Sequence, residues 1–191
     1  MELYPFLRLL HFAGFISLGG GLLAVFASEW RAYRTDGAMV FAEAAQYTAV
    51  FYQTMVLPGA ILIGVSGPLL MRHLGLGAFD APWLVGMWGL FVFEFLEGNT
   101  VTRIQFRRTL RLSQALVRSP SLTEEKRLGA RTRLGQIAHF LDIPLFSAII
   151  YCGVTRPSHW GPVGAAIGIG LITASLLTVL VPRMARRRRS D

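Results

Sequence analysis

The stretch from Leu90 to Leu112 constrains the fold of this chain more than any other. Its first half is almost wholly apolar but carries two carboxylates, Glu94 and Glu97, and its second half is rich in arginine. A stretch that changes from apolar to basic in this way predicts a membrane span that leaves the bilayer. An ionised carboxylate at mid-bilayer costs at least ~2.5 kcal/mol, so acids inside a span are candidates for a functional site.

The composition of the whole chain supports a membrane location. Of its 191 residues 53% are hydrophobic and 16% are charged, and the mean hydropathy is +0.48. A soluble domain carries about 25% charged residues. We therefore expect one integral membrane domain over residues 1–191. The single cysteine, Cys152, excludes an internal disulfide, and no P-loop, dinucleotide-binding glycine pattern or HExxH motif supports a soluble type of enzyme.

Five stretches are long and apolar enough to be membrane spans, since about 20 helical residues cross the ~30 Å of hydrocarbon. The sequence therefore predicts an all-α bundle of five transmembrane helices. We expect these spans over residues 4–27, 46–70, 83–102, 134–153 and 162–181. A basic loop over 103–133 follows the third span, and its first part has the pattern of an amphipathic helix.

Small residues within the spans predict close packing between helices. The first span holds the triplet Gly19-Gly20-Gly21, which removes side-chain bulk from one helix surface. Pro58 in the second span predicts a kink. In the fifth span, Gly164 and Gly168 have the GxxxG spacing of helix dimers, which is compatible with a homodimer.

The basic residues are distributed unevenly along the chain. Sixteen of the nineteen lysines and arginines lie in the segments 28–36, 103–133 and 182–191, which five spans would place on one side. The positive-inside rule then predicts an N-terminus outside and a C-terminus in the cytoplasm of a bacterial inner (plasma) membrane. The same charge would attract anionic lipid headgroups. No nucleic-acid-binding module accompanies it, so we expect no nucleic acid partner.

Two histidines are predicted near the outer face, His11 in the first span and His73 at the end of the second. Histidines on neighbouring membrane helices can supply the axial ligands of haem b. This pattern predicts cofactor binding at His11, with His73 or His139 as the second ligand. In the alternative interpretation, His73 is an interfacial residue and His11 hydrogen-bonds a neighbouring helix.

A second polar layer is predicted near the cytoplasmic face. Glu94 and Glu97 share a helix face because they are three residues apart, and His139 and Asp142 have the same spacing in the fourth span. If these faces meet, the four side chains could bind a transition metal such as iron, manganese or zinc. Two alternatives stay open. Glu97 could pair with a basic residue such as Arg103 while Asp142 orients His139, or the same residues could relay protons.

The segments LRLLHFAGFISLGGG and WLVGMWGLFVFEFLEGNTVTR resemble a group of small bacterial membrane proteins, domain-of-unknown-function family 2269. The chain is also similar, more remotely, to the CopD type of copper-resistance protein and the HemJ type of protoporphyrinogen oxidase. The HemJ resemblance implies a haem link for His11. That type also has a lysine in a later span, whereas Lys126, the only lysine here, lies in the basic loop.

These observations lead to three functional hypotheses. The first is a haem-binding redox membrane protein that works with a membrane redox partner. The second is a non-enzymatic accessory subunit or small proton-coupled transporter that uses the cluster of Glu94, Glu97, His139 and Asp142. The third is a scaffold that binds membrane lipid through the basic loop. Whether the protein is an enzyme stays open at this point.

Overall fold

The computed structural model describes residues 3–35, 37–118 and 133–187. Within these ranges the chain is helical apart from short connections, and it forms no strand. The all-α class expected from the apolar stretches is therefore confirmed. Residues 119–132 of the predicted basic loop, including Lys126, lie outside the described residues, as do 188–191 of the basic tail.

Helices follow one another in an up-and-down order, and two of them contain a π-helical segment of five residues. The described elements are α1 (Leu3–Arg34), α2 (Ala38–Phe51), η1 (Tyr52–Val56, π-helical), α3 (Leu57–His73), α4 (Pro82–Glu97), η2 (Gly98–Thr102, π-helical), α5 (Arg103–Arg118), α7 (Arg133–Thr155) and α8 (Trp160–Arg187). Since α2, η1 and α3 are continuous, they form one long helix, and α4, η2 and α5 form another.

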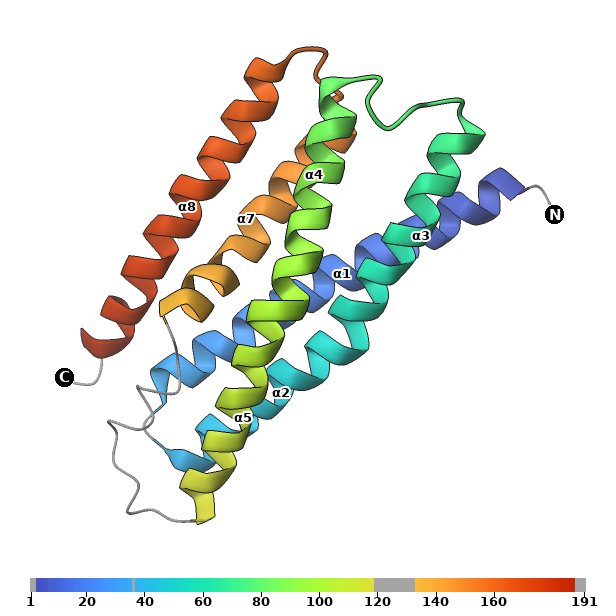
Figure 1. Cartoon of the computed structure of the whole chain (residues 1–191). Coiled ribbons are helices and arrows are strands. Elements are labelled where there is room, and N and C mark those ends of the chain that lie inside the picture. Colours follow the sequence, from blue (N-terminus) through green and yellow to red (C-terminus); the bar gives the residue numbers. More distant parts are fainter. Residues whose placement is uncertain (1–2, 36, 119–132, 188–191) are drawn as a thin grey trace.

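The long helices lie side by side in one elongated bundle (Figure 1). The main contacts join α1 to α3, α7 to α8, α1 to α2, α2 to α5 and α4 to α7. The described chain begins at one end of the bundle, where the α3–α4 and α7–α8 connections also lie, and finishes at the other (Figure 1). We call the end with the α1–α2 connection, α5 and the C-terminal part of α8 the basic end. It carries Arg31, Arg34, Arg103, Arg107, Arg108, Arg111, Arg118 and Arg183.

Four helices are long and apolar enough to cross a membrane: Leu3–Arg34, Ala38–His73, Leu134–Thr155 and Trp160–Met184. They coincide with four of the five predicted spans, although the first two extend well beyond 4–27 and 46–70. The first extends because the polar segment 28–36 stays helical to Arg34, and the second because α2 already begins at Ala38. The predicted third span differs. Its α-helix, α4, has 16 residues, which is about 24 Å, and it needs η2 to reach the thickness of the hydrocarbon.

Glycines allow α1 to approach the α2–α3 helix at backbone distance. A Cβ built on Gly59 would lie 2.5 Å from the Leu18 nitrogen and 2.8 Å from the Gly14 oxygen. A Cβ on Gly21 would lie 2.9 Å from the Val56 nitrogen. Real side chains do not fit at such distances, so these positions need glycine. The close packing predicted from the Gly19–Gly21 triplet is therefore present.

The GxxxG pair of the fifth predicted span behaves differently. A Cβ built on Gly164 or on Gly168 would meet nothing within 4 Å in the described chain. The two glycines therefore contribute nothing to packing between α8 and the described rest of the bundle. A homodimer through this helix stays a prediction.

Candidate functional site: an acidic cavity within the bundle

A small cavity of about 50 Å³ lies between α1, the α2–α3 helix, α4 and α7. Most of its wall is apolar, and its polar lining comes from four side chains: Tyr52, Glu94, Asn99 and Asp142. We call it the acidic cavity. A buried water needs roughly 10–15 Å³ and two to four polar partners. The acidic cavity therefore has room and partners for more than one water molecule.

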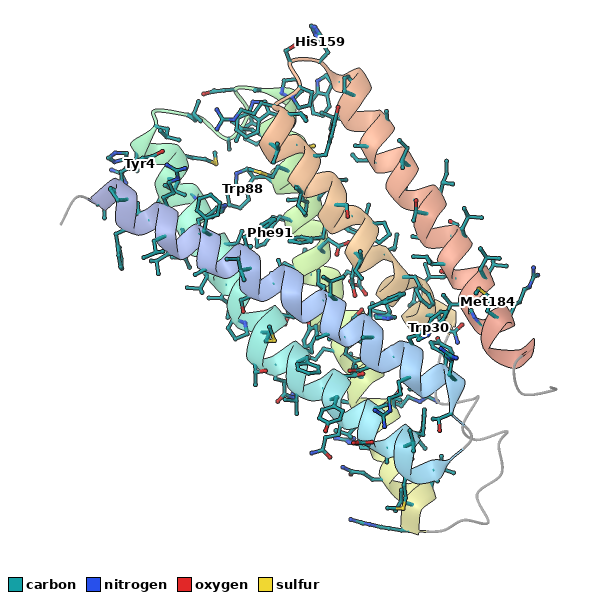
Figure 2. The ribbon with its side chains drawn as sticks, turned by 180° about the vertical axis from the view of Figure 1, so that it is seen from behind. Tyr4, Trp30, Trp88, Phe91, His159 and Met184 are labelled. Carbon is teal, nitrogen blue, oxygen red and sulfur yellow. The ribbon has the colours of Figure 1, made fainter. Side chains whose placement is uncertain are left out.

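The acidic cavity lies between the two ends of the bundle. Phe91, which belongs to its lining, is near the middle of the molecule in Figure 2. In the same view Tyr4 and His159 lie toward one end, and Trp30 and Met184 toward the other.

Glu94 and Asp142 reach the acidic cavity from two different helices, α4 and α7. The side chain of Asp142 is nearly fully buried, with a residue exposure of 7%. One carboxylate oxygen of Glu94, Oε1, is buried and has no hydrogen-bond partner among the described residues. A buried polar atom without a partner is costly, so it calls for a proton, a water or another ligand.

Glu97 lies one turn further along and is held differently. The hydroxyl of Thr102 donates a hydrogen bond of 2.8 Å to Glu97 Oε1, while Glu97 Oε2 is buried without a partner in the described chain. Among the described residues, Glu97 forms no ion pair with Arg103, although the sequence suggested one. Glu97 is thus tied to η2 of its own helix by a neutral donor.

Both π-helical segments border the acidic cavity. Tyr52 is the first residue of η1, and its hydroxyl lies 3.2 Å from the position that a Cβ of Gly98, the first residue of η2, would occupy. Single-turn π segments are rare in proteins overall, and many of those that occur lie at functional sites. Sequence reasoning missed Tyr52 as part of the cavity lining. The available signal was Pro58, which lacks an N–H donor and follows η1 closely, because a lost helical hydrogen bond favours such an irregular turn.

His139 is next to Asp142 but faces an aromatic environment. Its Nδ1 lies 3.7 Å from Asp142 Oδ2, beyond hydrogen-bond distance. Its ring centroid is 6.3 Å from that of Phe26, 5.8 Å from Phe106 and 5.2 Å from Phe140. His139 is buried, and neither ring nitrogen has a hydrogen-bond partner among the described residues. The predicted orientation of His139 by Asp142 is thus a contact between two buried groups rather than a hydrogen bond.

The four predicted metal ligands do not surround one point. Glu94 and Asp142 share the acidic cavity, whereas Glu97 contacts Thr102 and His139 lies among phenylalanines. In the described part of the chain, no three His, Cys, Asp or Glu side chains are grouped so that they could hold a metal ion. Metal binding by Glu94, Glu97, His139 and Asp142 therefore stays a prediction that this arrangement does not support.

The three histidines proposed for haem lie in separate places. His11 Nδ1 is 3.0 Å from the hydroxyl of Ser66 on α3, which is the hydrogen bond to a neighbouring helix that the alternative interpretation expected. His73 stacks on Tyr4 with ring centroids 5.3 Å apart. Tyr4 and His11 are seven residues apart on α1. The rings of His73 and His11 therefore lie about 10 Å apart along the axis of that helix.

His139 is further away still. It packs against Phe26, which follows His11 on α1 by fifteen residues, or about 22 Å. The described structure therefore brings no two of these histidines to opposite faces of one porphyrin. Haem b binding stays a prediction. In this arrangement a haem b would have one histidine as an axial ligand, such as His11, instead of two.

Comparison with known proteins gives one family. A family model described as "Predicted integral membrane protein (DUF2269)" matches residues 5–157, from the first turn of α1 to just beyond the end of α7. This match confirms the family resemblance suggested by the first and third spans. No curated protein and no solved structure gives a significant match, so the remote similarity to the CopD and HemJ types has no support.

Proposed function

The chain belongs to the DUF2269 family of predicted integral membrane proteins, and we propose that it takes up and passes protons at the acidic cavity, as a small proton-coupled membrane protein. The observation that carries this proposal is the position of Glu94 and Asp142. They come from two helices to one cavity inside a bundle of apolar helices, and a buried oxygen of Glu94 has no partner in the described chain. Acidic residues inside membrane bundles mark ion pathways and proton relays.

The topology proposed for this function has five crossings. α4 and η2 together comprise residues 82–102, roughly 30 Å of helix, enough to cross the hydrocarbon. With α4–η2 as the third span, the described ends of the chain lie on opposite sides, as their positions in Figure 1 suggest. The basic end would face the cytoplasm of a bacterial plasma membrane and the N-terminus the outside.

The chemistry follows from the neighbours of each acid. A water in the acidic cavity can accept a proton from the carboxyl group of Glu94 and give one to the carboxylate of Asp142, because both groups line the same space. From Asp142 the proton can pass to His139 when the 3.7 Å between Asp142 Oδ2 and His139 Nδ1 shortens to hydrogen-bond distance, and neither ring nitrogen has another partner in the described chain. His139 lies beside Phe106 of α5, so this path leads from the cavity toward the basic end.

The experiment that tests the proposal is proton flux into liposomes that contain the purified protein and a pH-sensitive dye, driven by a potassium-diffusion potential. We expect flux above that of protein-free liposomes for the wild type, and flux at the protein-free level for Glu94→Gln and for Asp142→Asn. Glu43→Gln is the matched control, because Glu43 is a half-exposed acid paired with Arg31 at 3.1 Å, away from the cavity. Wild-type flux at the protein-free level, or equal flux in all variants, would contradict the proposal.

A further inference from the structure

Helix α5 has two different faces. One face is buried against the bundle, mainly α2, through Gln105, Phe106, Thr109, Ser113 and Leu116. The other face exposes Arg107, Arg108 and Arg111. Because these arginines are spaced by one to four residues on a helix, they project from one side. No described carboxylate forms an ion pair with Arg107 or Arg111.

The exposed face also forms a shallow, open groove between side chains of α5. It has a volume of about 440 Å³, and its walls are three arginines and two aliphatic side chains: Ile104, Arg107, Arg108, Arg111 and Leu112. Ile104 is 65% exposed although it is a large aliphatic residue. An exposed aliphatic side chain beside a cluster of guanidinium groups suits a ligand with an anionic and an apolar part.

The depth of the groove follows from the length of the helix. If residues 82–102 cross the hydrocarbon, Ile104 lies about 3 Å beyond its edge, and Arg107 and Arg108 lie about 8–9 Å beyond. The polar headgroup layer is roughly 5–8 Å thick on each side. Arginine side chains can extend along the helix to reach that layer. This depth rests on α4–η2 being the third span of the proposed topology and is independent of the proton chemistry.

We propose that this groove binds the phosphate headgroup of an anionic phospholipid. The guanidinium groups of Arg107, Arg108 and Arg111 donate hydrogen bonds to phosphate oxygens, a pairing that planar guanidinium groups favour. Ile104 contacts the start of an acyl chain. These apolar contacts select a lipid over free phosphate. The site goes beyond the general attraction of basic residues to the membrane, because it depends on three particular side chains on one helix face.

The test is retention of lipid by the full-length protein, measured by native mass spectrometry in detergent during titration with phosphatidylglycerol or phosphatidylcholine. The test variant is Arg107→Gln/Arg108→Gln/Arg111→Gln. The matched control is Arg34→Gln/Arg118→Gln/Arg183→Gln, which removes three exposed charges from the same end. Because the test variant loses the guanidinium hydrogen bonds to the phosphate, we expect it to bind phosphatidylglycerol at least about tenfold more weakly, and the control variant to bind within about twofold of the wild type.

Three outcomes would overturn the proposal. Equal losses in both variants would show a diffuse charge effect, and no preference of the wild type for phosphatidylglycerol would remove the headgroup specificity. Inorganic phosphate that displaces the lipid more strongly than sodium chloride of equal ionic strength would indicate a phosphate site instead.

Glu94→Gln serves as a separate control, since it should leave lipid retention unchanged even if the proton proposal fails.

Discussion

The two polar layers of this bundle look alike in the sequence but differ in the structure. In the layer near the N-terminal end, His11 pairs with Ser66 and His73 stacks on Tyr4, so each ring has a local partner. In the layer nearer the basic end, Glu94 and Asp142 converge on one cavity, and atoms of Glu94 and His139 have no partner in the described chain. The difference teaches that a buried polar residue indicates a site when its hydrogen bonds are incomplete, not merely when it is buried.

The largest expected effect comes from breaking the helix contact that supports both layers. In Gly59→Leu the new side chain would overlap the backbone of α1 at Leu18 and Gly14. Overpacking costs typically 1–3 kcal/mol and sometimes more, so we expect about 3 kcal/mol of destabilisation in detergent unfolding. Gly164→Leu is the control, since a Cβ at Gly164 meets nothing within 4 Å. Similar stabilities for the two variants would mean that α1 and α3 do not pack as described.

The two layers can be compared directly by replacing one histidine in each. His139→Ala removes the group next to Asp142, and His11→Ala removes the ring that pairs with Ser66. Proton relays contribute typically 10²–10⁴-fold to catalysed steps, so we expect proteoliposome flux to fall at least about tenfold in His139→Ala. Flux in His11→Ala should stay within about twofold of the wild type. A larger loss in His11→Ala would reverse the assignment of the two layers.

Ser66→Ala tests whether the outer layer is structural. It removes the hydroxyl near His11 Nδ1 at 3.0 Å. Hydrogen bonds between membrane helices average ~0.6 kcal/mol, with values up to about 2. We expect a loss of about 1 kcal/mol in unfolding free energy and unchanged proton flux. Ser175→Ala is the control, because in the described part of the chain Ser175 donates its hydrogen bond within its own helix, to the Leu171 oxygen. Reduced flux with unchanged stability would show that His11 and Ser66 belong to a functional site.

The smallest effect is expected at the exposed histidine. His73 stacks on Tyr4 at an interplanar angle of 18° and is exposed. Ring pairs contribute roughly 0.5–1.5 kcal/mol, and exposed ones lie at the lower limit. His73→Ala should therefore lower the unfolding free energy by about 0.5 kcal/mol, measured as above, and leave flux unchanged. A change of absorption spectrum in this variant would instead support a cofactor role for His73.

Much of the fold was predictable because hydrophobic burial follows from residue type. Apolar length indicated four of the membrane helices, and the Gly19–Gly21 triplet indicated the close packing that Gly21 makes against Val56 of η1. The i, i+3 spacing of Glu94 and Glu97 placed them on one helix face. These inferences need only helix geometry, which the sequence determines locally.

The rest depends on contacts between helices that are distant in sequence. Nothing in the sequence placed Ser66 beside His11 or Tyr52 beside Gly98, because register between helices is a property of the packed bundle. The two π segments also shift the side chains that follow them, so a regular helix of 3.6 residues per turn predicts those faces wrongly. The haem hypothesis combined His11, His73 and His139, which lie at different levels along the axis of α1. The metal hypothesis concerns residues outside the shifted faces and stays a prediction: Glu94 and Glu97 precede η2, and His139 and Asp142 lie on α7.

Infrared difference spectroscopy of the reconstituted protein tests the central claim most directly, because it observes the carboxyl groups themselves and needs no ion gradient. The measurement records the carbonyl stretch of protonated carboxyl groups as the pH is changed, for the wild type and for Glu94→Gln/Asp142→Asn. If Glu94 and Asp142 exchange protons within the bundle, the wild type shows a pH-dependent carboxyl band from an apolar environment, and the double variant lacks it. Identical difference spectra for the two proteins would contradict this account.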